Sequence, residues 1–127
     1  MPFVRVSVAR ETSDEDLKLI SDAIHESMVA TFNVPEKDRF QVLTRHASNE
    51  ISCAPEYLGI THSGPLVLIQ ITCNEGRTLE MKKALFTQLA SSIAARTAVA
   101  AADVIVSLVE VKKENWSFGN GIAQYAS

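Results

Sequence analysis

The sequence repeats itself, and the repeat constrains the fold more than any other feature. When the chain is aligned with itself so that Glu15 meets Glu80, seven residues match without gaps over about 45 positions, roughly three times the ~5% expected by chance. The identical pairs are Glu15 and Glu80, Lys18 and Lys83, Ser27 and Ser92, Ala30 and Ala95, Val34 and Val99, Asp38 and Asp103, and Leu43 and Leu108. The repeat predicts that approximately residues 2–50 and 66–113 build the same unit, followed by a tail over residues 114–127.

Each half has the pattern of a strand, a helix and a second strand. The strand patterns cover residues 3–8 and 40–45 in the first half, and residues 66–72 and 104–111 in the second. Between them, apolar residues recur every three or four positions, which is typical of a helix with one buried face. The apolar stripes are Leu17, Ile20, Ile24, Met28 and Phe32, then Met81, Leu85, Leu89 and Ile93. Ser13 and Thr78 are the expected N-caps, and Pro35 closes the first helix.

We predict one α/β (α+β) domain over residues 1–127, built as a tandem βαβ repeat. Right-handed crossovers make the strands within each unit parallel, so two units form a four-stranded mixed sheet with two helices on one face. The other sheet face is then left uncovered, although some strands, such as Leu66–Ile69, are apolar on both sides. Self-association is the simplest way to cover such a face.

Composition argues against several classes of partner. With 127 residues, of which 46% are apolar, the chain can build one packed core. Its net charge of -3 provides no basic excess for nucleic acid, and no apolar stretch reaches the roughly 20 residues of a membrane helix.

The first residues do not form a secretory signal, so we expect a cytoplasmic protein. Cys53 and Cys73 should be reduced thiols, and His46 and His62 have no partners at metal-ligand spacing.

Several short motifs, in the right order, resemble the tautomerase superfamily over nearly the whole chain. They include Pro2 directly after Met1, Gly76-Arg77-Thr78 at the start of the second helix, and Phe118-Gly119-Asn120-Gly121 after the last strand. The second half is similar to 4-oxalocrotonate tautomerase, and the fused form is similar to the malonate semialdehyde decarboxylase branch. The segments that carry the second match are His25, residues 34–40, His46, Leu58-Gly59, residues 103–106 and residues 116–119. The resemblance implies a cofactor-independent enzyme of the tautomerase fold, assembled as a homotrimer, with a catalytic amino-terminal proline.

The chemistry is expected at Pro2 and Arg77. If Met1 is removed, Pro2 carries a secondary amine, and α-amino groups titrate around pH 7.7–8.0, where they can shuttle protons. Arg77 lies one residue before the helix cap, where a guanidinium and free amides can share a carboxylate. Thr12 stands at the matching position of the first half, so only one half carries this anion site. We therefore predict a keto–enol tautomerase that acts on small 2-oxo or enol carboxylates.

Five further residues are candidates for the same site. The resemblance implies that Asp38 assists the proline, whereas the presence of Asp103 at the matching position favours a structural role for both. His25 lies on the flank of the first helix, where a partly exposed histidine is expected, and the resemblance makes it a candidate substrate contact. Trp116, Phe118 and Tyr125 match the family segment that walls the pocket, and an apolar wall would exclude water.

One departure from the family pattern bears on the reaction. The decarboxylase branch has two arginines that flank a proline at the start of the second helix, whereas this chain has Glu75 in place of the first arginine. The reversed charge favours tautomerisation over decarboxylation. Two alternatives remain open: a decarboxylase or hydratase that uses protonated Pro2, and a non-catalytic trimeric binding protein.

Overall fold

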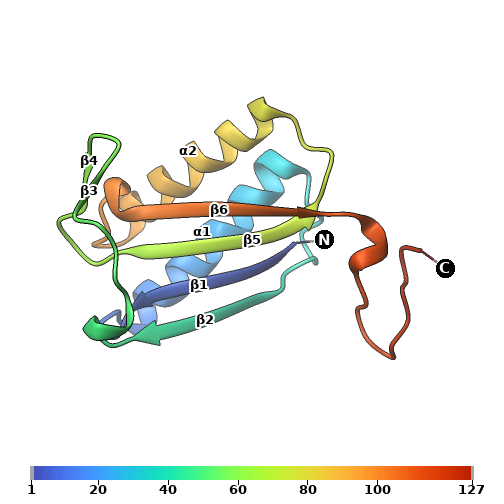
Figure 1. Cartoon of the computed structure of the whole chain (residues 1–127), viewed down its shortest axis with the longest axis horizontal. Helices are drawn as coiled ribbons and strands as arrows, with labels where there is room; N and C mark the ends of the chain where they lie inside the picture. Colours follow the sequence, from blue (N-terminus) through green and yellow to red (C-terminus); the bar gives the residue numbers. More distant parts are fainter. Residues whose placement is uncertain (1, 127) are drawn as a thin grey trace.

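The computed structural model describes residues 2–126 and has two layers, a four-stranded sheet and two helices that cover one of its faces (Figure 1). The four strands are β1 (Phe3–Ala9), β2 (Gln41–His46), β5 (Val67–Asn74) and β6 (Val104–Val111). The helices are α1 (Asp14–Phe32) and α2 (Leu79–Arg96), and short 3-10 turns cover Ser48–Glu50, Ala101–Asp103 and Lys113–Asn115. Met1 and Ser127, the ends of the predicted domain, lie outside the described residues.

The strand order β2-β1-β5-β6 confirms the predicted tandem repeat and mixed sheet. β1 pairs with β2 in parallel, and β5 pairs with β6 in parallel. The two units meet where β1 runs antiparallel to β5, with Phe3 opposite Thr72. The start of β1 therefore lies next to the end of β5.

Local sequence signals set both helix starts. The Ser13 hydroxyl oxygen accepts a hydrogen bond from the Asp16 amide at 3.0 Å, and the Thr78 hydroxyl oxygen accepts one from the Met81 amide at 3.2 Å. These bonds satisfy amides that have no partner within the helix, which confirms the two predicted N-caps. α1 ends at Phe32, and the following Asn33 turns the chain with a φ of 55° before Pro35 is reached.

The core lies between the helices and the side of the sheet that faces them. Alternate residues of β1 and β5 meet the two predicted apolar stripes there. The buried strand residues are Val4, Val6, Val8, Val67, Ile69, Ile71 and Cys73, and the buried apolar helix residues are Ile20, Ala23, Ile24, Met28, Phe32, Leu85, Leu89 and Ile93. Burial of these side chains is the dominant favourable term in folding, so the stripes determine which sheet face the helices cover.

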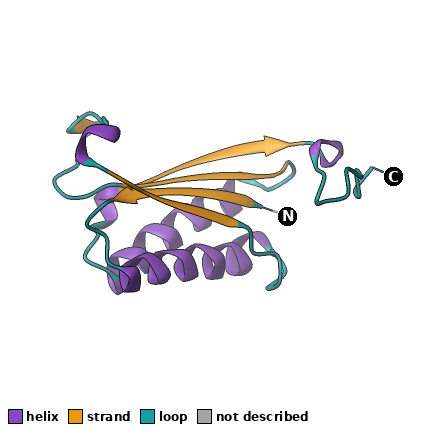
Figure 2. Cartoon of the chain, turned by 90° about the horizontal axis from the view of Figure 1, so that it is seen from below, coloured by secondary structure: helices purple, strands orange, loops and turns teal. Residues whose placement is uncertain are grey.

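Neither α1 nor α2 covers the opposite face of the sheet (Figure 2). The side chains on this face line a shallow hollow of about 280 Å³ that is partly apolar, at Leu68 and Ile105, and partly polar, at Arg5, Gln70 and Ser107. The predicted uncovered face is therefore present, and it combines apolar and polar groups.

The segment between the repeats folds in a way that the sequence analysis did not predict. β3 (Glu56–Tyr57) and β4 (Ile60–Thr61) form a hairpin, and its two turn residues, Leu58 and Gly59, have φ angles of 50° and 80°. A two-residue turn of this type needs a left-handed backbone at both positions, which glycine adopts without strain. The hairpin borders an apolar hollow of about 400 Å³ at the far end of the sheet, with Cys53 and Ile105 in its wall.

Asp103 braces the start of β6 at this far end. The residue is only 1% exposed, and its Oδ2 atom accepts a hydrogen bond from the Gly64 amide at 3.2 Å. A side chain at position 64 would place a Cβ atom 2.9 Å from Oδ2, so the close approach requires glycine. Asp38 at the matching position is half-buried, so the repeat has preserved the residue type in two different environments.

Candidate functional site

Four segments that are distant in sequence meet at one end of the sheet. Pro2 precedes β1, residues 38–40 precede β2, residues 75–77 follow β5, and the tail follows β6. The Val4 amide donates a hydrogen bond to the Phe40 carbonyl at 3.0 Å, which holds the second segment against the first. Figure 1 shows the N-terminus at the end of the sheet from which the C-terminal tail leaves. The topology thus brings the segments that carry the predicted Pro2, Asp38, Arg77 and Trp116 to the same end of the sheet.

A groove of about 530 Å³ lies at this end of the sheet. Phe3, the residue after Pro2, is part of its wall, whereas Pro2, Asp38 and Arg77 are not. The wall consists of Phe3, Arg39, Phe40, Gln41, Val42, Trp116, Ser117 and Phe118. Pro2 itself is buried. The aromatic rings make the wall largely apolar, and such a wall excludes water from a bound ligand. Arg39 and Phe40 were not among the predicted site residues.

The tail folds back on itself through aromatic contacts. The Trp116 and Phe118 rings stack with centroids 5.4 Å apart, and Tyr125 meets Phe118 edge to face at 5.2 Å. The Gln124 side chain accepts a hydrogen bond from the Phe118 amide at 2.9 Å and donates one to the Gly119 carbonyl at 3.1 Å. Trp116 and Phe118 therefore line the groove, and Tyr125 supports Phe118 from behind.

Arg77 is held at the same edge by backbone carbonyls. Its Nη1 donates to the Asn74 carbonyl at 3.1 Å, and its Nη2 donates to the Phe32 carbonyl at 3.2 Å, with the guanidinium 5.1 Å from the centre of the Phe32 ring. Both acceptors are neutral, so these bonds orient the guanidinium without cancelling its charge. Burial raises the pKa of the nearby Cys73 thiol, although the Arg77 charge partly opposes this effect, so Cys73 stays a neutral thiol.

Asn74 is a site residue that the sequence analysis missed. Its backbone carbonyl accepts the bond from Arg77, and its buried side-chain Oδ1 accepts a hydrogen bond from the Trp116 indole N–H at 2.7 Å. One residue thus fixes both the candidate anion site and an aromatic wall of the groove. The sequence did contain one sign of this role, because Asn74 is a polar residue at the end of a mostly apolar strand. A polar side chain that is buried in such a place needs a hydrogen-bond partner.

Asp38 lies in the turn that leads into β2. Its amide donates to the Pro35 carbonyl at 2.9 Å, and Phe40, two residues later, bonds to β1. Among residues 2–126, no ion pair engages the Asp38 carboxylate. Asp38 thus lies two residues before the point at which this segment bonds to β1.

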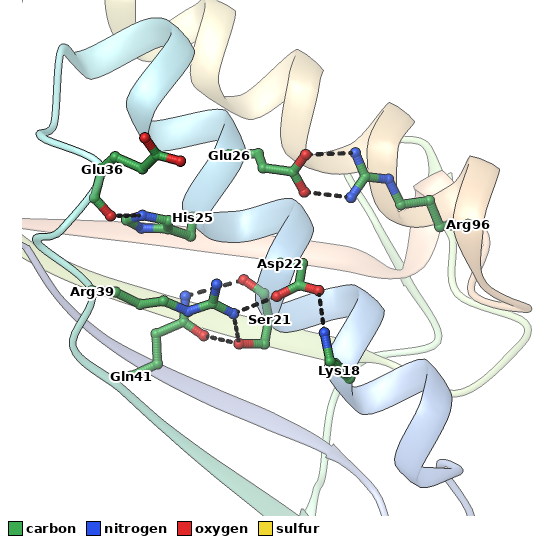
Figure 3. A network of polar contacts seen from close by, with 9 residues as sticks. All are labelled: Lys18, Ser21, Asp22, His25, Glu26, Glu36, Arg39, Gln41 and Arg96. Atoms are coloured by element: carbon green, nitrogen blue, oxygen red, sulfur yellow. Dashed lines mark hydrogen bonds and ion pairs between the residues drawn. The ribbon is translucent and has the colours of Figure 1, made fainter.

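The expectation that His25 is partly exposed was wrong. His25 is 5% exposed and does not line the aromatic groove. Its Nε2 atom lies 2.6 Å from the Glu36 carbonyl oxygen, and Figure 3 shows the ring directed at the loop between α1 and β2. The sequence analysis failed here because Ile24 and His25 are both buried, so the inward face of α1 is wider than the apolar stripe alone.

Within the described part of the chain, no group of three or more His, Cys, Asp or Glu residues is arranged to hold a metal ion. The helices among these residues are also too short or too polar to cross a membrane.

Known proteins are similar to this chain along almost its whole length. Two family models, both described as tautomerase enzyme, match residues 2–60 and residues 38–119. The chain is 40% identical to "Probable tautomerase YusQ" of Bacillus subtilis (strain 168), covering 98% of each chain. It is 32% identical to "Probable tautomerase YrdN" of the same organism, covering 98% of this chain and 96% of the relative.

Solved structures share the fold closely. FG41 malonate semialdehyde decarboxylase inhibited by 3-bromopropiolate superposes with a TM-score of 0.90 at 35% identity, covering 97% of this chain and 93% of that one. For a second malonate semialdehyde decarboxylase, the TM-score is 0.88 at 30% identity, covering 97% and 95%. Native fused 4-OT has the same fold, with a TM-score of 0.81 at 17% identity, covering 98% of each chain. The chain belongs to the tautomerase family.

Proposed function

We propose that the protein is a cofactor-independent keto–enol tautomerase that acts on small 2-oxo or enol carboxylates. The observation that carries this proposal is the meeting of Pro2 and Arg77 at one end of the sheet, beside an aromatic groove. A proton shuttle and a carboxylate ligand are the two groups that such a reaction needs. Removal of Met1 is part of the proposal, because it converts the Pro2 nitrogen from an amide into a free secondary amine.

In the proposed mechanism, Arg77 binds the substrate carboxylate and Pro2 moves one proton. For ketonisation, the Pro2 amine accepts the proton of the enol hydroxyl, which leaves an enolate and an ammonium. As the enolate oxygen lone pair forms the carbonyl bond, the C=C electron pair takes a proton from the ammonium at carbon, which restores the free amine. The number of protons is unchanged, so no other reactant is needed.

The surrounding residues tune this transfer. A carboxylate at Asp38 would stabilise the charged form of the amine, as an opposite charge a few ångströms away does. Trp116 and Phe118 would exclude water and strengthen the attraction between Arg77 and the substrate carboxylate. His25, a predicted substrate contact, has its Nε2 atom engaged with the Glu36 carbonyl, so we assign it no contact with the substrate.

Decarboxylation or hydration of a three-carbon oxo acid is the second candidate. It is favoured by the 35% and 30% identity to two malonate semialdehyde decarboxylase structures. Protonated Pro2 would then polarise the carbonyl, with Asp38 as its counter-ion. Glu75 argues against this reaction, because it stands where the decarboxylase pattern has the first of its two arginines. A trimeric binding protein without catalysis is the alternative from another class, and a retained Met1 would favour it.

The first prediction concerns the amine. Met1-processed protein should ketonise phenylenolpyruvate well above the buffer rate, and Pro2→Ala should lower kcat by at least about 100-fold, because general acid–base catalysis contributes that much. Absorbance at the enol band measures the rate, and Pro55→Ala is the matched control on an exposed loop. Equal rates for wild type and Pro2→Ala would contradict the role of the amine.

The second prediction concerns the carboxylate ligand. Arg77→Ala should raise KM about 10- to 100-fold, because a charge-assisted hydrogen bond contributes about 1.5–3 kcal/mol. Arg77→Lys should recover part of the loss, since it keeps the charge. Initial rates over a range of substrate concentrations give KM. A normal KM for Arg77→Ala would show that the carboxylate binds elsewhere.

The third prediction separates the two enzymatic candidates by pH. A free-amine tautomerase loses kcat/KM as the pH falls through the Pro2 pKa, because the base becomes protonated. A decarboxylase that needs the protonated amine loses kcat/KM as the pH rises through the same pKa. The profile is measured with phenylenolpyruvate and with malonate semialdehyde, and a tautomerase profile that falls with rising pH would contradict the free-amine mechanism.

The fourth prediction concerns assembly. We propose a homotrimer, because the sheet has a face that neither α1 nor α2 covers and because a fused 4-OT relative of the same fold is a symmetric trimer. Light scattering should give about 42 kDa, three times the chain mass of 13.9 kDa. A stable monomer at micromolar concentration would refute the trimer.

A further inference from the structure

His25 makes an unusual contact for a buried helix residue. It lies on α1 and bonds to the loop between α1 and β2, with 2.6 Å between its Nε2 atom and the Glu36 carbonyl oxygen. A carbonyl oxygen only accepts, so Nε2 carries the hydrogen. The Nδ1 atom is buried without a hydrogen-bond partner among the described residues. Among the described residues, the His25 ring therefore makes one hydrogen bond, and its partner is the Glu36 carbonyl of the loop.

Two neighbouring carboxylates on α1, Glu26 and Asp22, already have other partners (Figure 3). Glu26 accepts from Arg96 on α2 at 2.7 Å, and this contact holds the pKa of the Glu26 carboxyl below its usual value. Asp22 accepts from Arg39 at 2.6 Å and from Lys18 at 3.0 Å. The imidazole therefore does not compete for either carboxylate.

Two hydrogen bonds within the loop are local, and residues 36–40 are linked to the rest of the protein through the Glu36 carbonyl, the Arg39 side chain and the Phe40 carbonyl. The Asp38 amide bonds to the Pro35 carbonyl, and the Arg39 amide bonds to the Lys37 carbonyl. These turns shape the loop without fixing it to the rest of the protein. Two side-chain contacts link the loop to α1. His25 of α1 bonds to the Glu36 carbonyl, and the Arg39 guanidinium of the loop donates to Ser21 at 2.7 Å and to Asp22.

Asp38 lies between these two links. We propose that His25 is a positioning residue that fixes the Glu36–Phe40 segment through the Glu36 carbonyl, and thereby sets the distance between Asp38 and Pro2. Phe40, which lines the groove, is held separately, because its carbonyl accepts the hydrogen bond from the Val4 amide of β1. The catalytic part of this inference rests on the proposed function, whereas the anchoring of the segment does not.

The expected kinetic effect is specific. A displacement of about 1 Å at a reacting group can lower a rate by about 100-fold. Arg77 is held by Asn74 and Phe32, outside the anchored segment, so substrate binding should be little affected. Loss of the His25 bond should therefore lower kcat and leave KM nearly constant. A general loss of stability would also lower the apparent kcat at constant KM, but it would speed hydrogen exchange throughout the protein and not only in residues 36–40.

The test compares four variants of the full chain. His25→Leu removes the donor, and His25→Asn removes it with a shorter amide that does not extend to the Nε2 position. His25→Gln restores an N–H donor near that position. Glu26→Gln is the matched control, because it changes the adjacent residue and its bond to Arg96 but leaves the loop bond intact.

Two readouts decide the outcome: steady-state kinetics with phenylenolpyruvate, and hydrogen exchange of the amides of residues 36–40. We expect His25→Leu and His25→Asn to lower kcat about 10- to 100-fold, to change KM by less than about twofold, and to speed exchange in this segment. His25→Gln should recover most of both properties, and Glu26→Gln should resemble wild type. Wild-type kcat and exchange in His25→Asn, failure of His25→Gln to recover either, or an equal loss in Glu26→Gln would overturn the inference.

The experiment distinguishes this inference from the proposed function. If wild-type protein shows no tautomerase activity, the proposed function fails, and hydrogen exchange alone decides whether His25 anchors the segment. If wild type is active and His25→Asn matches it in both readouts, the proposed function stands and the positioning role fails.

Discussion

The candidate site depends on the antiparallel pairing of β1 with β5. Within each βαβ unit the two strands are parallel. In a single unit, the residues that precede the first strand and the residues that follow this strand therefore lie at opposite ends of the sheet. The antiparallel join places Phe3 opposite Thr72, and so brings the start of one unit to the end of the other. The proposed mechanism, in which Pro2 and Arg77 act on one small molecule, depends on this reversal.

Much of the fold was predictable because the same physical signals occur twice. Both caps, both apolar stripes and the four main strands follow from local patterns that the repeat reinforces. The β3–β4 hairpin was missed because it lies between the repeats, consists of strands of two residues, and has no alternating pattern long enough to detect. Its turn at Leu58 and Gly59 was the only local sign.

The site was less predictable because its residues act through contacts between distant segments. Pro2, Asp38, Arg77 and Trp116 carry motifs, and the topology brings these segments to one edge. Asn74 carries no motif, and its importance follows only from its bonds to Arg77 and Trp116. His25 was misjudged for a similar reason, since the carbonyl that it binds lies eleven residues away, in a loop without a regular pattern.

The two ends of the sheet carry matching positions of the repeat, but they differ in the covalent bonding of one backbone nitrogen. The far hollow has Cys53 and Ile105 at the positions that match Phe118 and Phe40 of the groove, and Val67 stands where the other end has Pro2. The Val67 nitrogen is joined to Leu66 in a peptide bond, so it can never be a free amine. In the proposed mechanism only the Pro2 position supplies an amine, so substitutions at the far end carry no cost to that chemistry. That end is free to change under other selection, such as packing against a second protein chain.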